Sequence, residues 1–386
     1  MYIITASSTK EDYKEAVFEI VEEIEKKKFE PKLILYFLSM KYPQDKIAVE
    51  IKSNFNCDCV GMTSAGGEYC DDKFYEHSLT AMCFSDKVFE EYDIVNLNLA
   101  EDMDIASVRR RVVAGYFNED AMRQDSKKYF AVTLLDISNP QYTDKADRLI
   151  EYFASYFNIT ALGGLSAPAS FLDDSNNCIH INGQTYKNYI GLIFFKAFND
   201  IDIISTHNQL PTNKILTPTA FGENNRIVKE FNHMPAIDAF SQAIGIDKDK
   251  IDNDVFQEFS LAFEPATDCF FTVQTKRSLP DGSLEYYAKI HSYVDYNVMY
   301  SSDMWFETKK AINLKLQKDI EEERLDKMIG VVEFNCLSRT NMLNKNNDMD
   351  RLVKLFDFAP HIGLSTSGEL YMGVMSYTSV LLFLYK

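Results

Sequence analysis

The N-terminal part of the chain alternates short apolar runs with a helical pattern. Residues 1–7 read as a strand, and apolar side chains then recur at the spacing of an amphipathic helix, at Tyr13, Ala16, Val17, Ile20, Val21 and Ile24. Ser8 and Glu11 match the S-x-x-E capping box, so we expect the helix to begin after Ser8. The apolar run 33–38 predicts a buried strand, and Pro43 marks the start of a second helix.

This order of strand, helix and glycine turn occurs three times along the chain. The first copy ends at the turn beginning with Gly61. A second copy has a strand over residues 130–135 and ends at the pair Gly163-Gly164. A third has a strand over residues 330–334 and ends at Gly363.

The first and third turns are related in sequence. Residues 61–68 read GMTSAGGE and residues 363–369 read GLSTSGE, and each turn is followed by a threonine, Thr80 or Thr378, in a hydrophobic strand. The middle turn, residues 163–167 with the sequence GGLSA, is a looser relative. Internal similarity of this kind indicates a repeated unit. We therefore predict an α/β fold of mixed α+β type: two lobes with mixed sheets and flanking helices, and pseudo-duplicated strand-helix-glycine-turn units.

The region between the second and third copies differs in pattern. A polar, proline-containing stretch at 208–225 is the best candidate for a domain boundary. A helix is expected after Pro235 with a glycine stop at Gly245, followed by a hairpin around the turn 280–282 and a solvated helix over 303–327.

Composition and charge narrow the class of protein. Of the 386 residues, 46% are hydrophobic, enough for large cores, and the formal net charge is -18. An acidic surface repels phosphate backbones and anionic lipids, so we expect neither nucleic-acid binding nor membrane insertion. The first residues read as a strand instead of a signal peptide, and seven scattered cysteines suggest reduced thiols, so we expect a cytoplasmic protein.

The hydroxyl-bearing glycine turns are candidates for ligand binding. Glycine permits close backbone approach, and the hydroxyls of Thr63, Ser64, Ser365 and Thr366 can bind an anion or a polar ligand. The alternative is a tight strand connection with capping hydroxyls. Glu68 and Glu369 can bind a ligand ammonium, or they can accept bonds from backbone amides within the turn.

Cys336 and Arg339 follow the third-copy strand. Ligands of open α/β sheets bind beyond the carboxyl ends of strands, where a guanidinium can hold a carboxylate by two hydrogen bonds. Cys336 is either a nucleophile or an inert thiol, and no histidine is near it in sequence.

Other reactive groups give weaker signals. Cys57 and Cys59 would share one face of a strand but lack the partner pair of a zinc site. The six histidines form no metal or haem-attachment motif, and no P-loop or nucleophile elbow is present. We therefore predict no metal, no catalytic residues and no bound cofactor, with haem as the alternative.

Five segments together resemble the FIST family, whose members have an N-terminal and a C-terminal half; the segments are 60–68, 162–167, 226–240, 334–339 and 363–369 with Thr378. The resemblance implies a FIST N-terminal-like domain over 1–215 and a FIST C-terminal-like domain over 216–386. It also implies an intracellular sensory module that binds a small polar ligand such as an amino acid. Downstream partners would be signalling proteins such as a histidine kinase or a chemoreceptor.

Two alternatives stay open beside this stand-alone sensor. Some family members resemble nitric-oxide sensors, which would make the chain a haem-binding gas sensor. The other alternative is a small-molecule enzyme that uses Cys336 or Glu369. For the sensor, we expect the ligand between the lobes, walled by the turns 61–68 and 363–369 and by Arg339.

Overall fold

The computed structural model describes residues 1–101, 110, 128–156, 160–166, 176–222, 225–266, 269–371 and 373–386. The chain is 28% helix and 43% strand, and several of its sheets are mixed, so the expected mixed α+β class is confirmed. Two compact units contain these elements. Unit 1 is formed by residues 1–205, 309–373 and 379–386, and unit 2 by residues 206–308 and 374–378.

The first sheet of unit 1 has the strand order β1-β6-β2-β3-β10-β11. Strand β2 runs parallel to β3 and antiparallel to β6, and strand β10 adds antiparallel to β3. The bounds are β1 (Ile3–Ser8), β2 (Leu33–Leu38), β3 (Asp58–Thr63), β6 (Leu79–Phe84), β10 (Ile179–Ile181) and β11 (Gln184–Tyr186).

The second sheet has the order β26-β25-β9-β8-β12-β7. Here β8 runs parallel to β9 and antiparallel to β12, and β25 adds antiparallel to β9. The bounds are β7 (Phe89–Asn98), β8 (Tyr129–Leu135), β9 (Thr160–Leu165), β12 (Tyr189–Ala197), β25 (Glu369–Tyr371) and β26 (Val374–Met375).

The third sheet has the order β13-β27-β23-β24-β4-β5. Here β23 runs parallel to β24 and antiparallel to β27, and β4 adds antiparallel to β24. The bounds are β4 (Glu68–Cys70), β5 (Lys73–Tyr75), β13 (Asp202–His207), β23 (Met328–Cys336), β24 (His361–Thr366) and β27 (Thr378–Tyr385).

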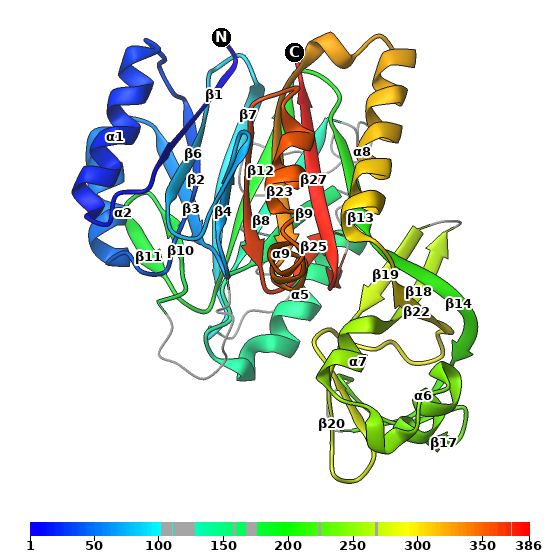
Figure 1. Cartoon of the computed structure of the whole chain (residues 1–386). Coiled ribbons are helices and arrows are strands. Elements are labelled where there is room, and N and C mark those ends of the chain that lie inside the picture. Colours follow the sequence, from blue (N-terminus) through cyan, green and yellow to red (C-terminus); the bar gives the residue numbers. More distant parts are fainter. Residues whose placement is uncertain are drawn as a thin grey trace. The chain divides into compact units, whose positions relative to one another are not determined.

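These three sheets are copies of one arrangement linked in a cycle. Each copy builds its own parallel pair and its long antiparallel strand, but its short strands after the glycine turn complete a different sheet. The first copy gives β4 and β5 to the third sheet, the third gives β25 and β26 to the second, and the second gives β10 and β11 to the first. Strands from the start, middle and end of the chain therefore lie together, as the blue, green and red ribbons of Figure 1 show.

The helices of unit 1 follow from local sequence signals. In α1 (Tyr13–Lys26), buried Ala16, Val17 and Ile20 lie in the core with α2 (Gln44–Asn54), which begins after Pro43 as expected. The expected capping box at Ser8 is wrong, because Asp12 accepts the amides of Lys14 and Glu15. The other helices are α5 (Thr143–Tyr156), α9 (Leu337–Lys345), α10 (Met349–Val353) and, starting in unit 2, α8 (Met304–Glu321).

Unit 2 contains two antiparallel sheets, ordered β14-β22-β18-β19 and β15-β16-β21-β20, with β17 paired to β16. Helix α6 (Ala236–Ile244) starts after Pro235 and ends at Gly245 as expected, because Gly245 adopts a left-handed φ of 74°. The remaining elements are α7 (Asn253–Glu258), β14 (Gln209–Leu216), β15 (Pro218–Phe221), β16 (Ile227–Phe231), β17 (Met234–Pro235), β18 (Phe259–Ala266), β19 (Cys269–Val273), β20 (Thr275–Ser278), β21 (Leu284–Tyr286) and β22 (Tyr296–Ser301).

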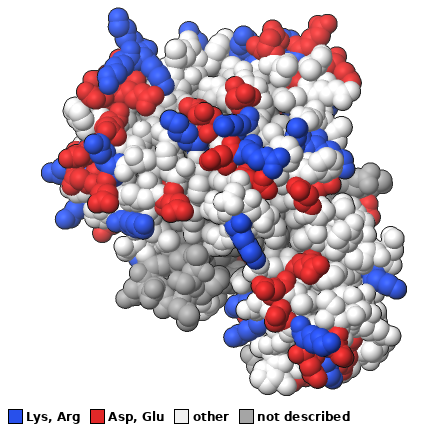
Figure 2. All heavy atoms as spheres, viewed as in Figure 1, with Lys and Arg blue, Asp and Glu red and all other residues white. Residues whose placement is uncertain are grey.

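The repeated unit is present three times, as the sequence indicated, and all three copies contribute to unit 1. The repeats therefore do not divide between two lobes, because the exchanged strands tie each copy to another. The stretch 208–225 carries β14 and β15 of unit 2, and the division into family halves at 215 and 216 stays a prediction. On the face in Figure 2, basic and acidic side chains are interspersed.

Candidate functional site

The first glycine of each turn lies at an equivalent position in its sheet. Gly61, Gly163 and Gly363 each pair with the neighbouring parallel strand and with an incoming short strand. A Cβ at Gly61 would lie 2.4 Å from Cε2 of Tyr36, and a Cβ at Gly363 would lie 2.8 Å from Cβ of Glu333. These contacts leave no room for a side chain, which explains why glycine occupies these positions.

The first and third turns lie side by side. The amide of Ala65 donates to the carbonyl of Ser365 at 2.7 Å, and the amide of Ser365 donates to the carbonyl of Gly67 at 2.9 Å. From the sequence we expected the turns 61–68 and 363–369 to wall one ligand site. In the structure these two turns are adjacent. They lie in the same unit and not on separate lobes, because β4 of the first copy pairs with β24 of the third.

Glu68 is a fully buried carboxyl in a cage of hydroxyls. The hydroxyl of Ser78 donates to its Oε2 at 2.8 Å, and the hydroxyl of Ser64 donates to its Oε1. Burial raises the pKa of Glu68 to about 7, although the two serine hydroxyls lower it in part. The group therefore changes its protonation near neutral pH.

Glu369 occupies the equivalent place in the third copy. The hydroxyl of Thr366 lies 2.8 Å from Oε1 of Glu369 and 3.3 Å from the carbonyl oxygen of Asn335. Both Glu369 and Thr366 are fully buried. The two related turns thus share a buried glutamate bonded to the hydroxyl three residues after the first glycine.

The middle copy has a carboxylate from a different place in the chain. The hydroxyl of Ser166, three residues after Gly163, donates to Oδ1 of Asp136 at 2.8 Å. Burial raises the pKa of Asp136, while bonds from Asn188, Ser138 and Ser166 lower it in part. Sequence reasoning missed Asp136; the signal was a polar residue directly after the strand 130–135. Ala167 of this turn lies outside the described residues.

Arg339 is the largest fully buried side chain of the described residues and lies on α9. Its Nε donates to Oδ1 of Asn335 at 2.9 Å, and Nδ2 of Asn335 donates to the hydroxyl of Tyr69 at 2.8 Å. Burial lowers the pKa of the guanidinium, and Glu333 followed by Cys336 and Glu369 oppose this change. Helix α9 starts directly after β23, which fixes Arg339 one turn beyond Asn335.

The same network reaches both glycine turns. The hydroxyl of Thr340 lies 2.8 Å from the hydroxyl of Tyr69, which belongs to the first copy. It also lies 2.7 Å from the hydroxyl of Ser365 in the third copy. Arg339, Asn335, Tyr69, Thr340 and Ser365 therefore form one buried polar network, which we call the arginine network.

The other predicted residues are also buried but have separate contacts. The hydroxyl of Thr63 lies 3.3 Å from the carbonyl oxygen of Cys178 and accepts the Cys178 amide at 3.1 Å. Cys336 caps α9 and is 6% exposed, so its thiol has little access to solvent. Thr63 thus ties β3 to the chain before β10, as the competing structural interpretation of the turns expects.

Two buried histidines have protein groups at both ring nitrogens. His180 has Sγ of Cys178 at 3.2 Å from Nε2 and the Tyr36 hydroxyl at 3.0 Å from Nδ1. Burial lowers the pKa of His180 to about 3, so its imidazole is neutral. His361 has Glu333 at 3.1 Å from Nε2. Haem ligation by either histidine would require breaking such a contact. Sequence reasoning had not paired these residues.

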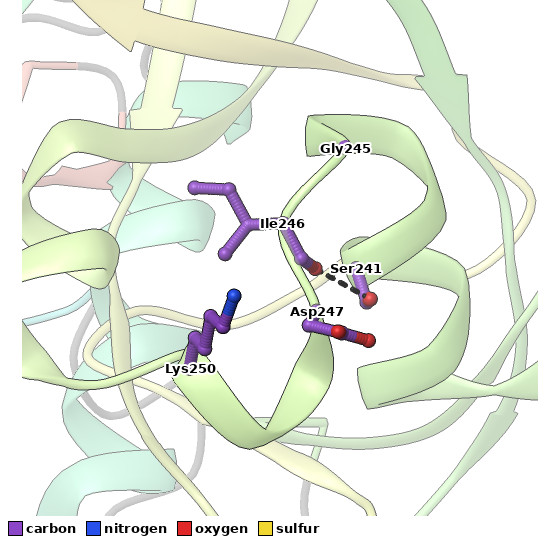
Figure 3. Close-up of a pocket in the computed structure, with 5 residues that line it drawn as sticks. All are labelled: Ser241, Gly245, Ile246, Asp247 and Lys250. Atoms are coloured by element: carbon purple, nitrogen blue, oxygen red, sulfur yellow. Dashed lines mark hydrogen bonds between the residues drawn. The ribbon is translucent and has the colours of Figure 1, made fainter.

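Two surface cavities lie elsewhere. One, of about 530 Å³, lies in unit 2 at the end of α6, where the hydroxyl of Ser241 donates to the carbonyl of Ile246 at 2.6 Å (Figure 3). The other, of about 400 Å³, lies in unit 1 and includes Lys32, Asp58 and Tyr92 in its lining. None of the predicted site residues lines either cavity. Within the described residues, no group of three or more His, Cys, Asp or Glu side chains has a metal-binding arrangement.

The fold and the buried polar site define a mixed α+β module of three interlocked repeats with ionisable groups where the repeats meet. The family model described as FIST N domain matches residues 32–234, and the chain belongs to this family. FIST is a sensory signal-transduction family. The resemblance of the segments after residue 234 to a FIST C-terminal half stays a prediction.

Other comparisons add little. No curated protein matches the chain. A solved structure described as "T. maritima PurL complexed with AMPPCP" aligns at 9% identity and a TM-score of 0.21, covering 100% of this chain and 73% of that chain. A TM-score this low carries no argument about fold or function. Among the described helices, none combines the length and apolar character needed to cross a bilayer.

Proposed function

We propose that this chain is a sensory module that binds a small polar ligand carrying a carboxylate and an ammonium group, such as an amino acid. The observation that carries the proposal is the arginine network, in which a fully buried guanidinium joins both glycine turns. Buried arginine is costly unless anionic or dipolar partners surround it, so a site that retains one suits an anionic group.

The chemistry of the surrounding residues fits such a ligand. The guanidinium of Arg339 would hold the carboxylate, and Glu369 or Glu68 would accept the ammonium. Hydroxyls would complete the site, and the proposed ligand-binding set is Thr63, Ser64, Glu68, Cys336, Arg339, Ser365, Thr366 and Glu369. Because these side chains are buried, ligand entry requires the turns to separate, which is the conformational change a sensor needs. A downstream histidine kinase or chemoreceptor would respond to it.

The first test is a thermal-shift screen with amino acids and related small carboxylates. A ligand at 100 times its Kd stabilises the folded state by about 2.7 kcal/mol, which is a measurable rise in Tm. A complete panel without any shift would count against the proposal.

The second test measures affinity for a hit by calorimetry in two arginine variants. Arg339→Lys keeps the charge but loses the two-pronged geometry, and we expect a loss of about 1.5–3 kcal/mol, or roughly 10- to 140-fold in Kd. Arg351→Ala is the control, because this arginine of α10 is 54% exposed at its side chain and pairs with Asp348, the residue just before the helix. Unchanged affinity in a destabilised Arg339→Lys protein would assign the arginine a structural role only.

A further inference from the structure

Two cysteines separated by one residue lie at the start of β3. Cys57 directly precedes this strand, and Cys59 is its second residue. Both thiols face the hydrophobic core formed with α1 and α2, because residues two apart in an extended chain share a face. The ligand-binding proposal uses neither residue.

The two residues are in contact. Sγ of Cys59 donates to the carbonyl oxygen of Cys57 at 3.5 Å, and the two side chains are neighbours on one face of the strand. Nζ of Lys52 donates to the same carbonyl at 2.7 Å and brings a positive charge close to Cys57. The two thiols therefore already lie within reach of each other in the folded chain.

Access differs between the two thiols. Cys57 is 9% exposed, and Cys59 is fully buried. The small exposed part of Cys57 is therefore where solvent meets the pair, so a small oxidant reaches Cys57 before Cys59.

We infer that Cys57 and Cys59 form a peroxide-oxidised dithiol switch, with Cys57 as the attacking thiol and Cys59 as the resolving thiol. The Cys57 thiolate attacks an oxygen of a hydroperoxide, the O–O bond breaks, and Cys57 becomes a sulfenic acid while an alcohol or water leaves. The Cys59 thiol then displaces the sulfenic hydroxyl as water and forms the disulfide. Two thiols lose two electrons and two protons, and the hydroperoxide accepts them.

The charge environment separates the two roles. The neighbouring thiol of Cys59 is the main influence that lowers the pKa of Cys57. Burial and Asp58 oppose this change, and Lys52 and Lys32 add to it. The neighbouring thiol of Cys57 and burial raise the pKa of Cys59. A thiolate is the nucleophile in such reactions, so the first attack falls to Cys57.

The backbone spacing of the two cysteines would make the disulfide reversible. Two residues apart in a strand, the Cα atoms are separated by roughly 6.6 Å, near the upper limit of about 6.8 Å for a disulfide. A bond formed at this limit is strained and readily reduced, as regulatory disulfides are. We therefore expect it to be reduced by a dithiol such as dithiothreitol.

The test treats the native full-length chain with up to a small excess of hydrogen peroxide, blocks free thiols, and maps the tryptic peptide 53–73. This peptide holds three of the seven cysteines, Cys57, Cys59 and Cys70. We expect it to lose two hydrogen atoms, with fragmentation suppressed between residues 57 and 59, and to recover both after reduction. Peroxide that leaves the peptide unchanged while the chain is folded would overturn the inference.

Three variants separate the roles of the thiols. Cys59→Ser should stop at a sulfenic acid on Cys57 that dimedone traps, and Cys57→Ser should leave Cys59 unoxidised. Cys70→Ser is the control, since Cys70 is buried in the same peptide and should not affect the reaction. Loss of two hydrogens from this peptide that persists in Cys59→Ser would assign the partner to Cys70, and a cross-link to the peptide that holds Cys83 would assign it to Cys83; either result would refute the pair.

Discussion

Glu68 offers a quantitative test of the buried site, through the replacement Glu68→Gln. Burial raises its pKa from about 4.5 to about 7, so the folded chain holds this proton more tightly than the unfolded chain does. The unfolded state therefore binds fewer protons between these two values, and the contribution of Glu68 to stability falls as pH rises. Glutamine imitates the protonated form and does not titrate.

The magnitude follows from the two pKa values. Each pKa unit corresponds to about 1.36 kcal/mol, so the full penalty of ionising Glu68 is about 3 kcal/mol. It is largely absent near pH 4.5 and complete above pH 7. The variant should therefore gain stability over the wild type by about 2.5 kcal/mol more at pH 8 than at pH 5.

The assay is urea unfolding of both proteins at pH 5, 6, 7 and 8. Subtracting the free energy of unfolding of one protein from that of the other cancels the contributions of all other titrating groups. Glu285→Gln is the comparison: burial raises the pKa of Glu285, but Lys276 and Arg277 outweigh it and leave the pKa lowered. Its wild-type contribution is lost only as pH falls below about 4.5, so the Glu285→Gln difference should stay nearly constant from pH 5 to 8. A Glu68→Gln difference that stays constant with pH would refute the reasoning, because Glu68 would then be charged throughout.

Two further predictions test the packing of unit 1. Gly61→Ala should destabilise the fold by about 1–3 kcal/mol, because the added Cβ would lie 2.4 Å from the Tyr36 ring; urea unfolding measures this, and a smaller loss in a Tyr36→Ala background would confirm the contact. Asp319→Ala should cost roughly 1.5–3 kcal/mol, because it removes the carboxylate 2.5 Å from the buried ammonium of Lys315, which keeps Asp202 at 3.1 Å. Glu22→Ala, which breaks an exposed pair, should cost less than about 1 kcal/mol, and equal losses would contradict the role of burial.

The parts of the fold that sequence predicted are those that depend on local pattern. The strand at 33–38, the helix after Pro43 and the helix between Pro235 and Gly245 follow from apolar runs, proline and glycine, and the structure confirms them. The predicted cap at Ser8 was wrong, because the helix begins at Tyr13 and its first free amides, those of Lys14 and Glu15, bond to Asp12. Serine and aspartate are both good caps, so the local sequence alone did not decide between these two starts.

The contacts of the candidate site followed from the sequence only where the sequence repeats itself. Glu68 and Glu369 stand at matching places in related turns, and both proved to be bonded to the matching hydroxyl. Asp136 was missed because its turn lacks the glutamate and its partner Ser166 is 30 residues away. The contact of Cys178 and His180 with Tyr36 and Thr63 depends on strand exchange between copies, which no local pattern encodes.

The strand exchange explains why the buried carboxyls lie where they do. Glu68 belongs by its backbone to the third sheet, since β4 pairs with β24, but Ser64 and Ser78, which hold its carboxyl, flank strands of the first sheet. Glu369 in the second sheet is likewise bonded to Thr366 at the end of β24 in the third. Each glutamate thus spans a joint between two copies.

The third joint is closed differently. At the position of Glu68 and Glu369 in the middle copy stands Ile179, and the contact with the first sheet is made by Thr63 to Cys178 and by Tyr36 to the neutral ring of His180. Two joints therefore hold a buried glutamate carboxyl, and the third holds an apolar side chain at the same position. Because β4 carries Glu68 into the third sheet while Ser64 and Ser78 flank strands of the first, ionisation of Glu68 would act on two sheets at once.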